Sequence, residues 1–293
     1  MFDIEKTYKP KDVQALEKVL EETAEEGKII AGGTDVVVKL REGMIKPKAL
    51  IDISTLKELQ FIRQQEGKIR IGAGTTFADL EDHPLLEGRL RGLKEGAMEV
   101  GSPQIRNAGT IGGNICNASP AADTVPPLLA LDALVVLGSR HGKRTMKLED
   151  FFLGKGKVDL APGEYLSYLE FEGMKEGRGL GFSKLGPRKA LAISKICTAV
   201  YMELDGDRRV VEIRIANGSL GPTSLREREV EGVLRGKTLT VEQRKKALEK
   251  FKEVLNRRLK GRWDGDFKEE AIRGVFSEAL RKAMDRALGK ETS

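Results

Sequence analysis

Residues 101–120 read GSPQIRNAGTIGGNICNASP, and the interpretation of the whole chain starts from this segment. The segment shows neither the 3.6-residue period of an amphipathic helix nor the alternation of a half-buried strand. It is rich in glycine, asparagine, serine and threonine, so its backbone can curl and its amides and hydroxyls can hydrogen-bond. We therefore predict a long irregular loop, and a loop of this length inside a compact domain is usually functional.

A second glycine-rich turn lies about 80 residues earlier, so that Ala31-Gly32-Gly33-Thr34-Asp35 is matched by Thr110-Ile111-Gly112-Gly113-Asn114. Each turn lets successive backbone N–H groups point into one concavity, as proteins do when they hold phosphate oxygens. Two such turns suit a pyrophosphate held from both sides, and Lys28 can add a positive charge beside the first. The alternative is that both are only tight turns, because short glycine motifs match often by chance.

Two further motifs have weaker interpretations. Gly72-Ala73-Gly74-Thr75-Thr76-Phe77 begins like a dinucleotide-binding fingerprint, but Phe77 replaces the third glycine and no clear βαβ unit surrounds it. A strand end turning into a helix over residues 77–81 is the preferred interpretation. Asp123 precedes Pro126-Pro127, where its carboxylate can accept hydrogen bonds from sugar hydroxyls or can cap the helix that the prolines begin. Lys184 and Arg188 lie beside a glycine-proline turn, and exposure to solvent is the simplest interpretation of such a cluster.

The chain divides into three parts by its hydrophobic pattern. Residues 1–55 predict a helix over 13–20 and strands at 29–31, 36–40 and 50–53. Residues 56–176 predict short strands around 69–71, 133–137 and 166–171. Residues 177–293 predict a hairpin of 193–204 with 210–216, followed by helices over 225–234, 240–259 and 267–288, the second opening with a Thr240–Gln243 capping box. A glycine-rich linker is expected at 173–181, and the fold class is α+β.

Composition excludes several classes of function. The 293 residues include only two cysteines and two histidines, which rules out a disulfide framework and leaves no set of ligands for a cysteine-held cluster. The net charge of +6 arises entirely from Leu225 onward, where 19 Lys/Arg are interleaved with 13 Asp/Glu. This interleaving disfavours nucleic-acid binding. No apolar run is long enough to cross a bilayer, and the acidic N-terminus lacks a secretory pattern, so a cytoplasmic protein is expected.

The sequence resembles a known family in four segments: Ala31–Asp35, Ile71–Thr76, Gln104–Asn114 and Ser119–Asp123. These look like the FAD-binding medium subunit of molybdenum hydroxylases, a family that includes carbon monoxide dehydrogenase and the xanthine dehydrogenases. The resemblance runs along nearly the whole chain in order. It implies a two-part FAD-binding fold of the vanillyl-alcohol oxidase type over 1–55 and 56–176, and a C-terminal flavoprotein domain of small antiparallel sheet and helices over 177–293.

The resemblance also implies which residues bind the cofactor, and no catalytic or metal-binding residue is expected in this chain. In the family pattern the first turn and the second motif contact the FAD pyrophosphate, Asp123 holds sugar or ribityl hydroxyls, and Leu166 and Lys184 lie near the flavin ring. The full expected set is Lys28, Ile29, Ile30, Ala31, Gly32, Gly33, Thr34, Asp35, Val36, Ile105, Thr110, Ile111, Gly112, Gly113, Asn114, Asn117, Asp123, Leu166 and Lys184. The chain departs from some members at Val100, where they have a phenylalanine, and at Leu191-Ala192, where they have an acidic pair.

By resemblance, the chain is an electron-transfer subunit. Electrons would come from the [2Fe–2S] clusters of a small subunit, the molybdopterin would reside in a large subunit, and NAD, a quinone or another acceptor would be reduced. A dimer of heterotrimers is expected. Three alternatives remain open: a stand-alone reductase of the same fold, such as the UDP-N-acetylenolpyruvoylglucosamine reductase group, a nucleotide-binding scaffold without turnover, and a basic nucleic-acid module.

Overall fold

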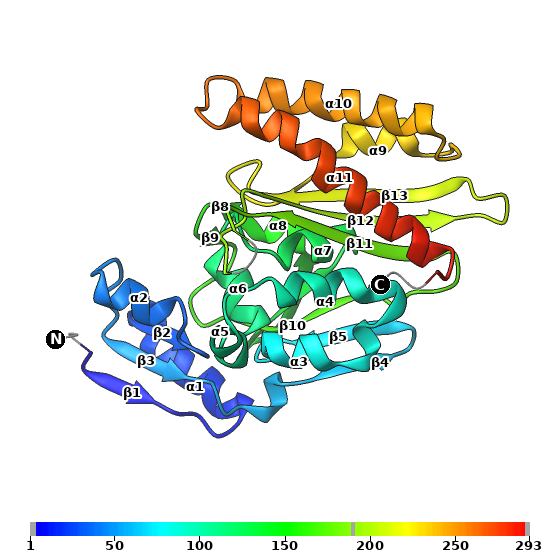
Figure 1. Cartoon of the computed structure of the whole chain (residues 1–293). Coiled ribbons are helices and arrows are strands. Elements are labelled where there is room, and N and C mark those ends of the chain that lie inside the picture. Colours follow the sequence, from blue (N-terminus) through cyan, green and yellow to red (C-terminus); the bar gives the residue numbers. More distant parts are fainter. Residues whose placement is uncertain (1–3, 189–190, 291–293) are drawn as a thin grey trace.

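The computed structural model describes residues 4–188 and 191–290, and its mixed helices and antiparallel sheets confirm the predicted α+β class (Figure 1). The N-terminal part is a small parallel sheet in the order β1-β3-β2, formed by Lys6–Tyr8, Ala49–Asp52 and Gly27–Ile30. Helix α1 (Val13–Thr23) packs on this sheet through Leu16 and Leu20 and begins where Asp12 accepts a hydrogen bond from the backbone of Ala15. Short 3-10 turns cover Ala24–Glu26 and Lys57–Leu59.

The second sheet has five antiparallel strands in the order β4-β5-β10-β6-β7. The strands are Ile62–Gln65, Lys68–Gly72, Tyr165–Glu172, Leu134–Ser139 and Gly142–Lys147. The helices of this part are α3 (Phe77–Asp82), α4 (Arg91–Met98), α5 (Pro103–Ala108), α6 (Ile111–Asn117), α7 (Val125–Ala130) and α8 (Leu148–Phe151). The remaining pieces are the ribbon of β8 (Phe152–Gly154) and β9 (Lys157–Val158) and the 3-10 turns Pro84–Leu86 and Gly88–Leu90.

The third sheet is antiparallel in the order β11-β12-β13-β14 and carries the C-terminal helices. Its strands are Arg178–Leu185, Ile196–Leu204, Val210–Gly218 and Leu225–Arg226, and the helices are α9 (Arg228–Leu234), α10 (Val241–Leu259) and α11 (Gly265–Ala287). Helix α11 lies directly on β11 because Gly179 and Gly181 have no side chains. A Cβ on Gly181 would be 2.0 Å from the carbonyl oxygen of Ala279.

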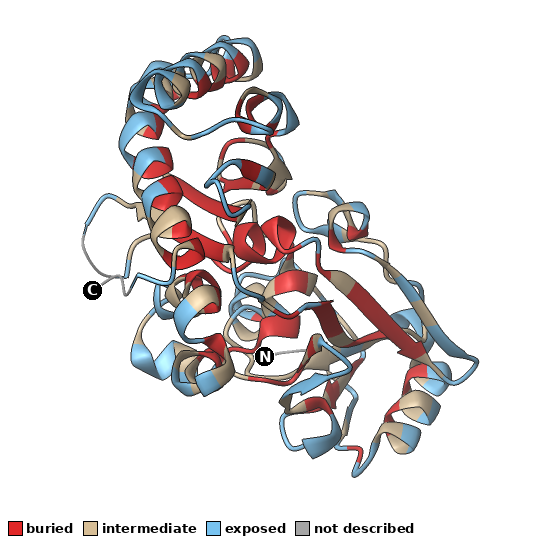
Figure 2. Cartoon of the chain, turned by 90° about the vertical axis from the view of Figure 1, so that its right-hand side faces the viewer, coloured by how far each residue is buried: buried red, intermediate tan, exposed pale blue. Residues whose placement is uncertain are grey.

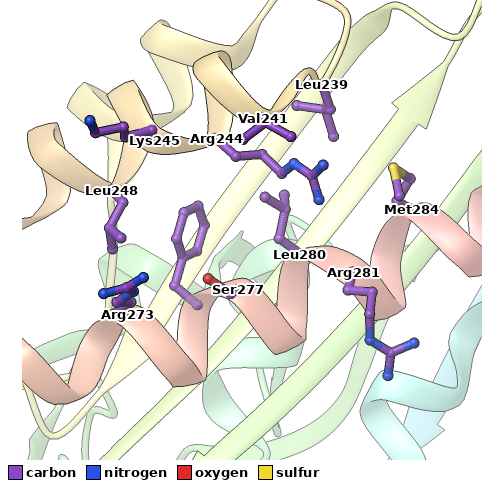
Figure 3. Close-up of a pocket in the computed structure, with 11 residues that line it drawn as sticks. Leu239, Val241, Arg244, Lys245, Leu248, Arg273, Ser277, Leu280, Arg281 and Met284 are labelled. Carbon is purple, nitrogen blue, oxygen red and sulfur yellow. The ribbon is translucent and has the colours of Figure 1, made fainter.

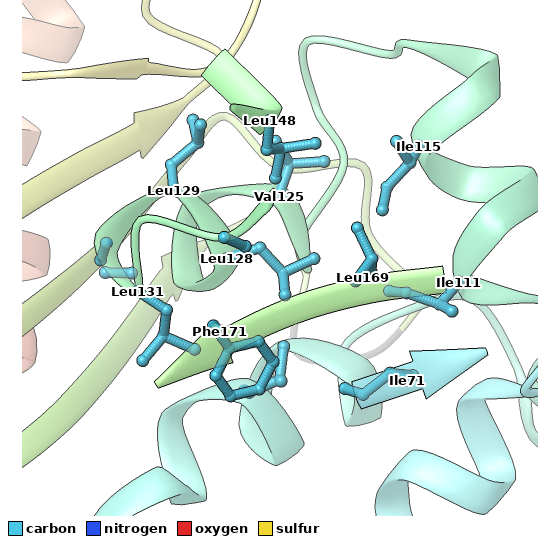
Figure 4. Packing of buried hydrophobic residues seen from close by; sticks show 14 of the residues in the cluster. Ile71, Ile111, Ile115, Val125, Leu128, Leu129, Leu131, Leu148, Leu169 and Phe171 are labelled. Atoms are coloured by element: carbon cyan, nitrogen blue, oxygen red, sulfur yellow. The ribbon is translucent and has the colours of Figure 1, made fainter. Parts of the chain in front are cut away.

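Alternating side chains of the third sheet belong to two different cores (Figures 2 and 4). One set, including Phe182, Ala199 and Tyr201, joins the central cluster that Figure 4 shows around Leu128, Leu169 and Phe171. The other set, including Val200 and Met202, packs under the C-terminal helices. The sheet is therefore buried on both faces, and the burial colours of Figure 2 follow it through the centre of the molecule.

Four sequence-based expectations were wrong. Residues 36–40 form helix α2 (Val36–Arg41) rather than a strand, because the chain turns into helical hydrogen bonding at the glycine turn, with Val37 N donating to Gly33 O. The segment 101–120 contains α5 and α6 rather than an irregular loop. The expected helix over 225–234 starts only at Arg228, after β14. The second half of the expected linker, residues 178–181, is already part of β11.

Caps explain why the two unexpected helices after residue 101 form in a glycine-rich segment. Ser102 accepts a hydrogen bond from Ile105 N before α5, and Thr110 accepts one from Gly113 N before α6. A hydroxyl cap satisfies one of the free N–H groups of the first turn and offsets poor helix propensity. Other expectations were confirmed: the helix after Gly72–Thr76, the hairpin of β12 and β13, and the Thr240 cap that accepts from Gln243 N.

Candidate flavin-binding site

The first glycine turn packs against the end of α5. Gly33 has a φ of +71°, a conformation that favours glycine, and a Cβ on Gly32 would lie only 1.7 Å from the carbonyl oxygen of Ala108. The turn that follows β2 and the segment that precedes α6 are therefore in direct contact.

Side chains from α2 and α6 join across the same contact. Asn117 Nδ2 donates to Asp35 Oδ1 at 2.9 Å, and Asn117 Oδ1 accepts from Lys39 Nζ at 2.5 Å. Burial raises the pKa of the Cys116 thiol to about 11, an effect that the nearby positive charge of Lys28 opposes. Two segments that are far apart in the sequence thus lie against each other, with Lys28 and Lys39 beside them, and the region between the two segments is taken as the candidate concavity.

Gly113 has more room for a side chain than Gly32. Its φ is not positive, it is exposed, and a Cβ built on it would meet only Thr110 Oγ1, at 3.1 Å. A bound group could fill the space in front of Gly113. Of the half-buried apolar residues in the first turn, Ile29 packs against the N-terminal core, whereas Ile30 and Val36 belong to no core cluster of the described residues.

Other predicted site residues face inward. Ile111 is fully buried, and a Cβ on Gly112 would be 2.6 Å from that of Ala73. Their backbone N–H groups donate to Thr75 O and Ala73 O, so these two residues support the site from inside. Leu166 lies on β10, against which α6 packs, and belongs to the central cluster. Ile105 is 38% exposed on α5. The predicted cofactor-binding residues therefore fall into two kinds: some are exposed at the site, and others are buried beneath it and support it.

Asp123 and Lys184 form a buried ion pair between the second and third sheets. Lys184 Nζ donates to Asp123 Oδ2 at 2.8 Å and to the carbonyl oxygen of Glu99 at 3.0 Å, and Ser194 Oγ donates to Asp123 Oδ1 at 2.5 Å. Burial raises the pKa of Asp123, and the ammonium of Lys184 opposes this shift. Two alternative interpretations are thereby excluded: Asp123 does not cap α7, whose N-cap Thr124 has no side-chain cap bond, and Lys184 is not a solvated surface lysine. Their roles in cofactor binding stay predictions.

This ion pair is continuous with the concavity. Thr124 Oγ1 donates to Asn114 Oδ1 at 2.8 Å, which ties the residue after Asp123 to the outward face of α6. Sequence reasoning missed Lys39, Thr124 and Ser194. Lys39 could have been found, since a helix starting after Asp35 places it one turn further on. Ser194 carried no signal, because it is 71 residues from the carboxylate that it contacts.

Among the described residues, no group of three metal-ligating side chains comes together. Within the same residues, none of the helices has the length and apolar character needed to span a membrane.

The geometry points to a class of protein: one in which a glycine turn with N–H groups unengaged among the described residues, two lysines and an open glycine position lie together and suit a phosphate-containing cofactor. Residues 2–171 match the family described as the FAD binding domain in molybdopterin dehydrogenase, and residues 182–283 match the CO dehydrogenase flavoprotein C-terminal domain. The chain belongs to this family of FAD-binding oxidoreductase subunits, and FAD is its cofactor.

Relatives agree along the full length. The nicotinate dehydrogenase FAD-subunit of Eubacterium barkeri is 37% identical over 264 residues, covering 89% of each chain. The putative xanthine dehydrogenase FAD-binding subunit of Escherichia coli is 32% identical over 267 residues, covering 90% of this chain and 91% of that protein. A solved structure of carbon monoxide dehydrogenase from Hydrogenophaga pseudoflava that lacks the Mo-pyranopterin moiety matches with 31% identity and a TM-score of 0.88, over 97% of this chain and 98% of that one.

Proposed function

We propose that this chain is the electron-transfer subunit of a molybdenum-containing dehydrogenase complex. It would accept electrons from [2Fe–2S] clusters of a small subunit and pass them to NAD, a quinone or another acceptor, while a large subunit holds molybdopterin in a dimer of heterotrimers. The names of its relatives support this role, as do its two cysteines, too few to hold such clusters. The match of the C-terminal domain favours it over a stand-alone reductase. A cytoplasmic location stays a prediction.

FAD supplies the one- and two-electron chemistry when it is bound, and the chain supplies binding, orientation and charge. The backbone N–H groups of 32–35 would hold the pyrophosphate oxygens, and Lys28 and Lys39 would offset their charge. The N–H groups of residues 112–114 already donate to Ala73 O, Thr110 Oγ1 and Thr110 O, so the second motif would border the cofactor without donating these bonds. Asp123, held by Lys184 and Ser194, would meet sugar or ribityl hydroxyls with a carboxylate of fixed orientation. The observation that carries this assignment is that the open space at Gly113 lies on the same face of α6 as Asn117, which bonds to Asp35 and Lys39 beside the first turn.

An exposed apolar surface beside the Asp123 cluster suits the small subunit. Trp263 is 87% exposed and Ile193 is 78% exposed, and Lys195 Nζ lies 5.5 Å from the centre of the Trp263 ring, so the two loops that carry them are neighbours. Ser194, between Ile193 and Lys195, bonds to Asp123. Exposed tryptophan next to aliphatic residues is typical of protein interfaces, and this surface would place the clusters near the flavin.

The test replaces Gly113 with leucine. Because the new side chain enters the space proposed for the pyrophosphate, the purified Gly113→Leu chain should lose most of its visible flavin absorbance per chain after desalting and reconstitution. Gly232→Leu is the matched control, since Gly232 is also an exposed helical glycine, and a Cβ placed on it would have no neighbouring atom within 4 Å. Far-UV circular dichroism checks that both variants fold. Equal flavin content in Gly113→Leu and the parent chain would overturn the assignment.

A further inference from the structure

A groove of about 340 Å³ lies between α10 and α11, far from the flavin-binding concavity (Figure 3). The two helices form a hairpin and stay in contact as far as Phe251 and Phe276, whose rings meet edge to face with centroids 5.2 Å apart. Beyond this contact α11 follows β11, while α10 runs on above the sheet (Figure 1). The groove is the open end of this hairpin.

The floor of the groove is apolar. Leu248 on α10 and Leu280 and Met284 on α11 face it, and Leu239 and Val241 close one end (Figure 3). Val241 is 76% exposed, the largest exposure among the aliphatic residues of this groove. The residues that line the groove recur every three or four positions, over 241–248 on α10 and 273–284 on α11. This is the spacing of a helix face that packs against another helix.

The rim is cationic and carries no acid. Arg244 and Lys245 stand on the α10 side and Arg273 on the α11 side, and within the part of the chain that the structure describes none of the three forms an ion pair. Arg273 is only near enough to Glu270, which pairs with Lys252, to help lower the pKa of that carboxyl. Two other cations are paired: Lys246 with Glu242, and Arg281, which also lines the groove, with Glu278 and Asp285. Among the residues described, the cations without an ion pair at the groove are therefore Arg244, Lys245 and Arg273.

We propose that this groove binds an acidic amphipathic helix of another polypeptide, with apolar side chains on the floor and carboxylates facing the three cations. The lined stretch of α11, residues 273–284, spans about 17 Å, which corresponds to three turns of a bound helix. A second copy of this chain does not suit the groove, since two such rims would place cations against cations. A flat anionic membrane would reach the rim but not the floor.

The experiment uses the full chain and a labelled synthetic helix of four turns that has leucine on one face and glutamate on both flanks. Fluorescence anisotropy should show saturable binding to the parent chain. The double variant Arg244→Glu/Arg273→Glu should bind this peptide at least about tenfold more weakly, because two attractions become repulsions. The matched control Lys155→Glu/Arg208→Glu alters two exposed cations elsewhere on the surface and should bind like the parent.

A second peptide with lysine flanks completes the design. It should bind the charge-reversed variant better than the parent chain, and hydrogen exchange should show protection of 244–248 and 273–284 in the complex with the glutamate-flanked helix. Equal binding of both peptides by the parent, or undiminished binding of the glutamate-flanked peptide by the reversed variant, would overturn the proposal. So would binding to phosphatidylglycerol vesicles without binding to the peptide, which would assign the rim to a lipid surface.

Discussion

Gly32 and Gly113 belong to two similar motifs, yet their surroundings differ. At Gly32 a neighbouring backbone leaves no room for a side chain, whereas the space at Gly113 is open apart from Thr110 Oγ1. The residue type alone does not distinguish these surroundings. The distances around each position do, and they assign Gly32 to the fold and Gly113 to the site.

Gly32→Ala should therefore destabilise the chain even without flavin. The methyl group would overlap Ala108 O, so the first turn must move, at a cost of about 1–3 kcal/mol in the free energy of unfolding. Gly113→Ala is the control, because its methyl group would meet a single side-chain oxygen. Urea denaturation of the flavin-free chains measures both, and an undiminished stability of Gly32→Ala would contradict the contact.

The Asp123–Lys184 pair leads to a second residue-scale prediction. Lys184→Met leaves a buried carboxylate without its cation and should cost about 3–5 kcal/mol in the free energy of unfolding. Asp123→Asn/Lys184→Met removes both charges and should lose clearly less than Lys184→Met alone. Urea denaturation at neutral pH measures a double-mutant cycle, whose four members are the parent chain, Lys184→Met, Asp123→Asn and the double variant. Additive losses in the double variant would show that the two charges do not interact.

Helices rather than loops shape the site at the scale of elements. Hydroxyl caps begin α5 and α6 in a segment whose composition predicts an irregular loop. Helix α2 begins directly after a glycine turn, even though its first residues are β-branched and favour strands. These short helices fix which face of each motif borders open space. Ser102 before Pro103, and Thr110 three residues before Gly113, were the available signals.

The β6–β7 hairpin is held to the segment before β10 by an ion pair that acid should break. Arg144 donates to both oxygens of Glu164, at 2.7 and 2.8 Å, and this bond holds the pKa of the Glu164 carboxyl below its usual range. A carboxyl whose pKa is lower in the folded state stabilises the fold above its unfolded pKa of about 4.3, and this stability is lost as the pH falls.

Glu164→Gln should then lower the free energy of unfolding at pH 7 by about 1 kcal/mol, a modest effect because the Arg144 side chain is 39% exposed and screened by solvent. The loss should shrink as the pH falls from about 4 through the lowered folded-state pKa of Glu164, because the parent carboxyl is then protonated as well. Denaturant titrations at several pH values measure it. Glu176→Gln, at an exposed position, is the control, and a loss that does not change with pH would refute the role of charge.

The whole molecule is organised by the sheet of β11–β14. One face of this sheet completes the central core, and the other face packs under α10 and α11. Neither of these two cores would be fully buried without the sheet. Arg286 on α11 pairs with Glu95 on α4, and Asp132 before β6 pairs with Arg214 and Arg226 of the third sheet. The predicted boundaries at 55/56 and 176/177 stay predictions, but the contacts across the second one are extensive.

We expect residues 56–176 and 177–293 to unfold together. A shared core couples their stabilities, so far-UV circular dichroism should show one transition in denaturant. Native-state hydrogen exchange should give β5, β6 and β12 the same opening free energy. Loss of protection in β12 and β13 at a lower denaturant concentration than in β5 and β6 would show that the C-terminal part is an independent unit.

The sequence by itself determined the fold class, three strands of the second sheet, the β12–β13 hairpin of the third, the long C-terminal helices and the positions of the two glycine motifs. These features depend on local hydrophobic periodicity and on glycine residues at turns. They can therefore be recognised without knowing which segments pack against them. It also indicated most of the residues proposed to hold FAD, through the order and spacing of four motifs.

Only the tertiary structure decided which of these residues face open space, why Gly32 and Gly113 differ, and that Ser194 and Lys184 orient Asp123. It alone placed three unpaired cations around an apolar groove between α10 and α11. The physical reason is distance along the chain: burial and ion pairing between segments tens of residues apart follow from packing of sheets and helices, and no local pattern encodes them.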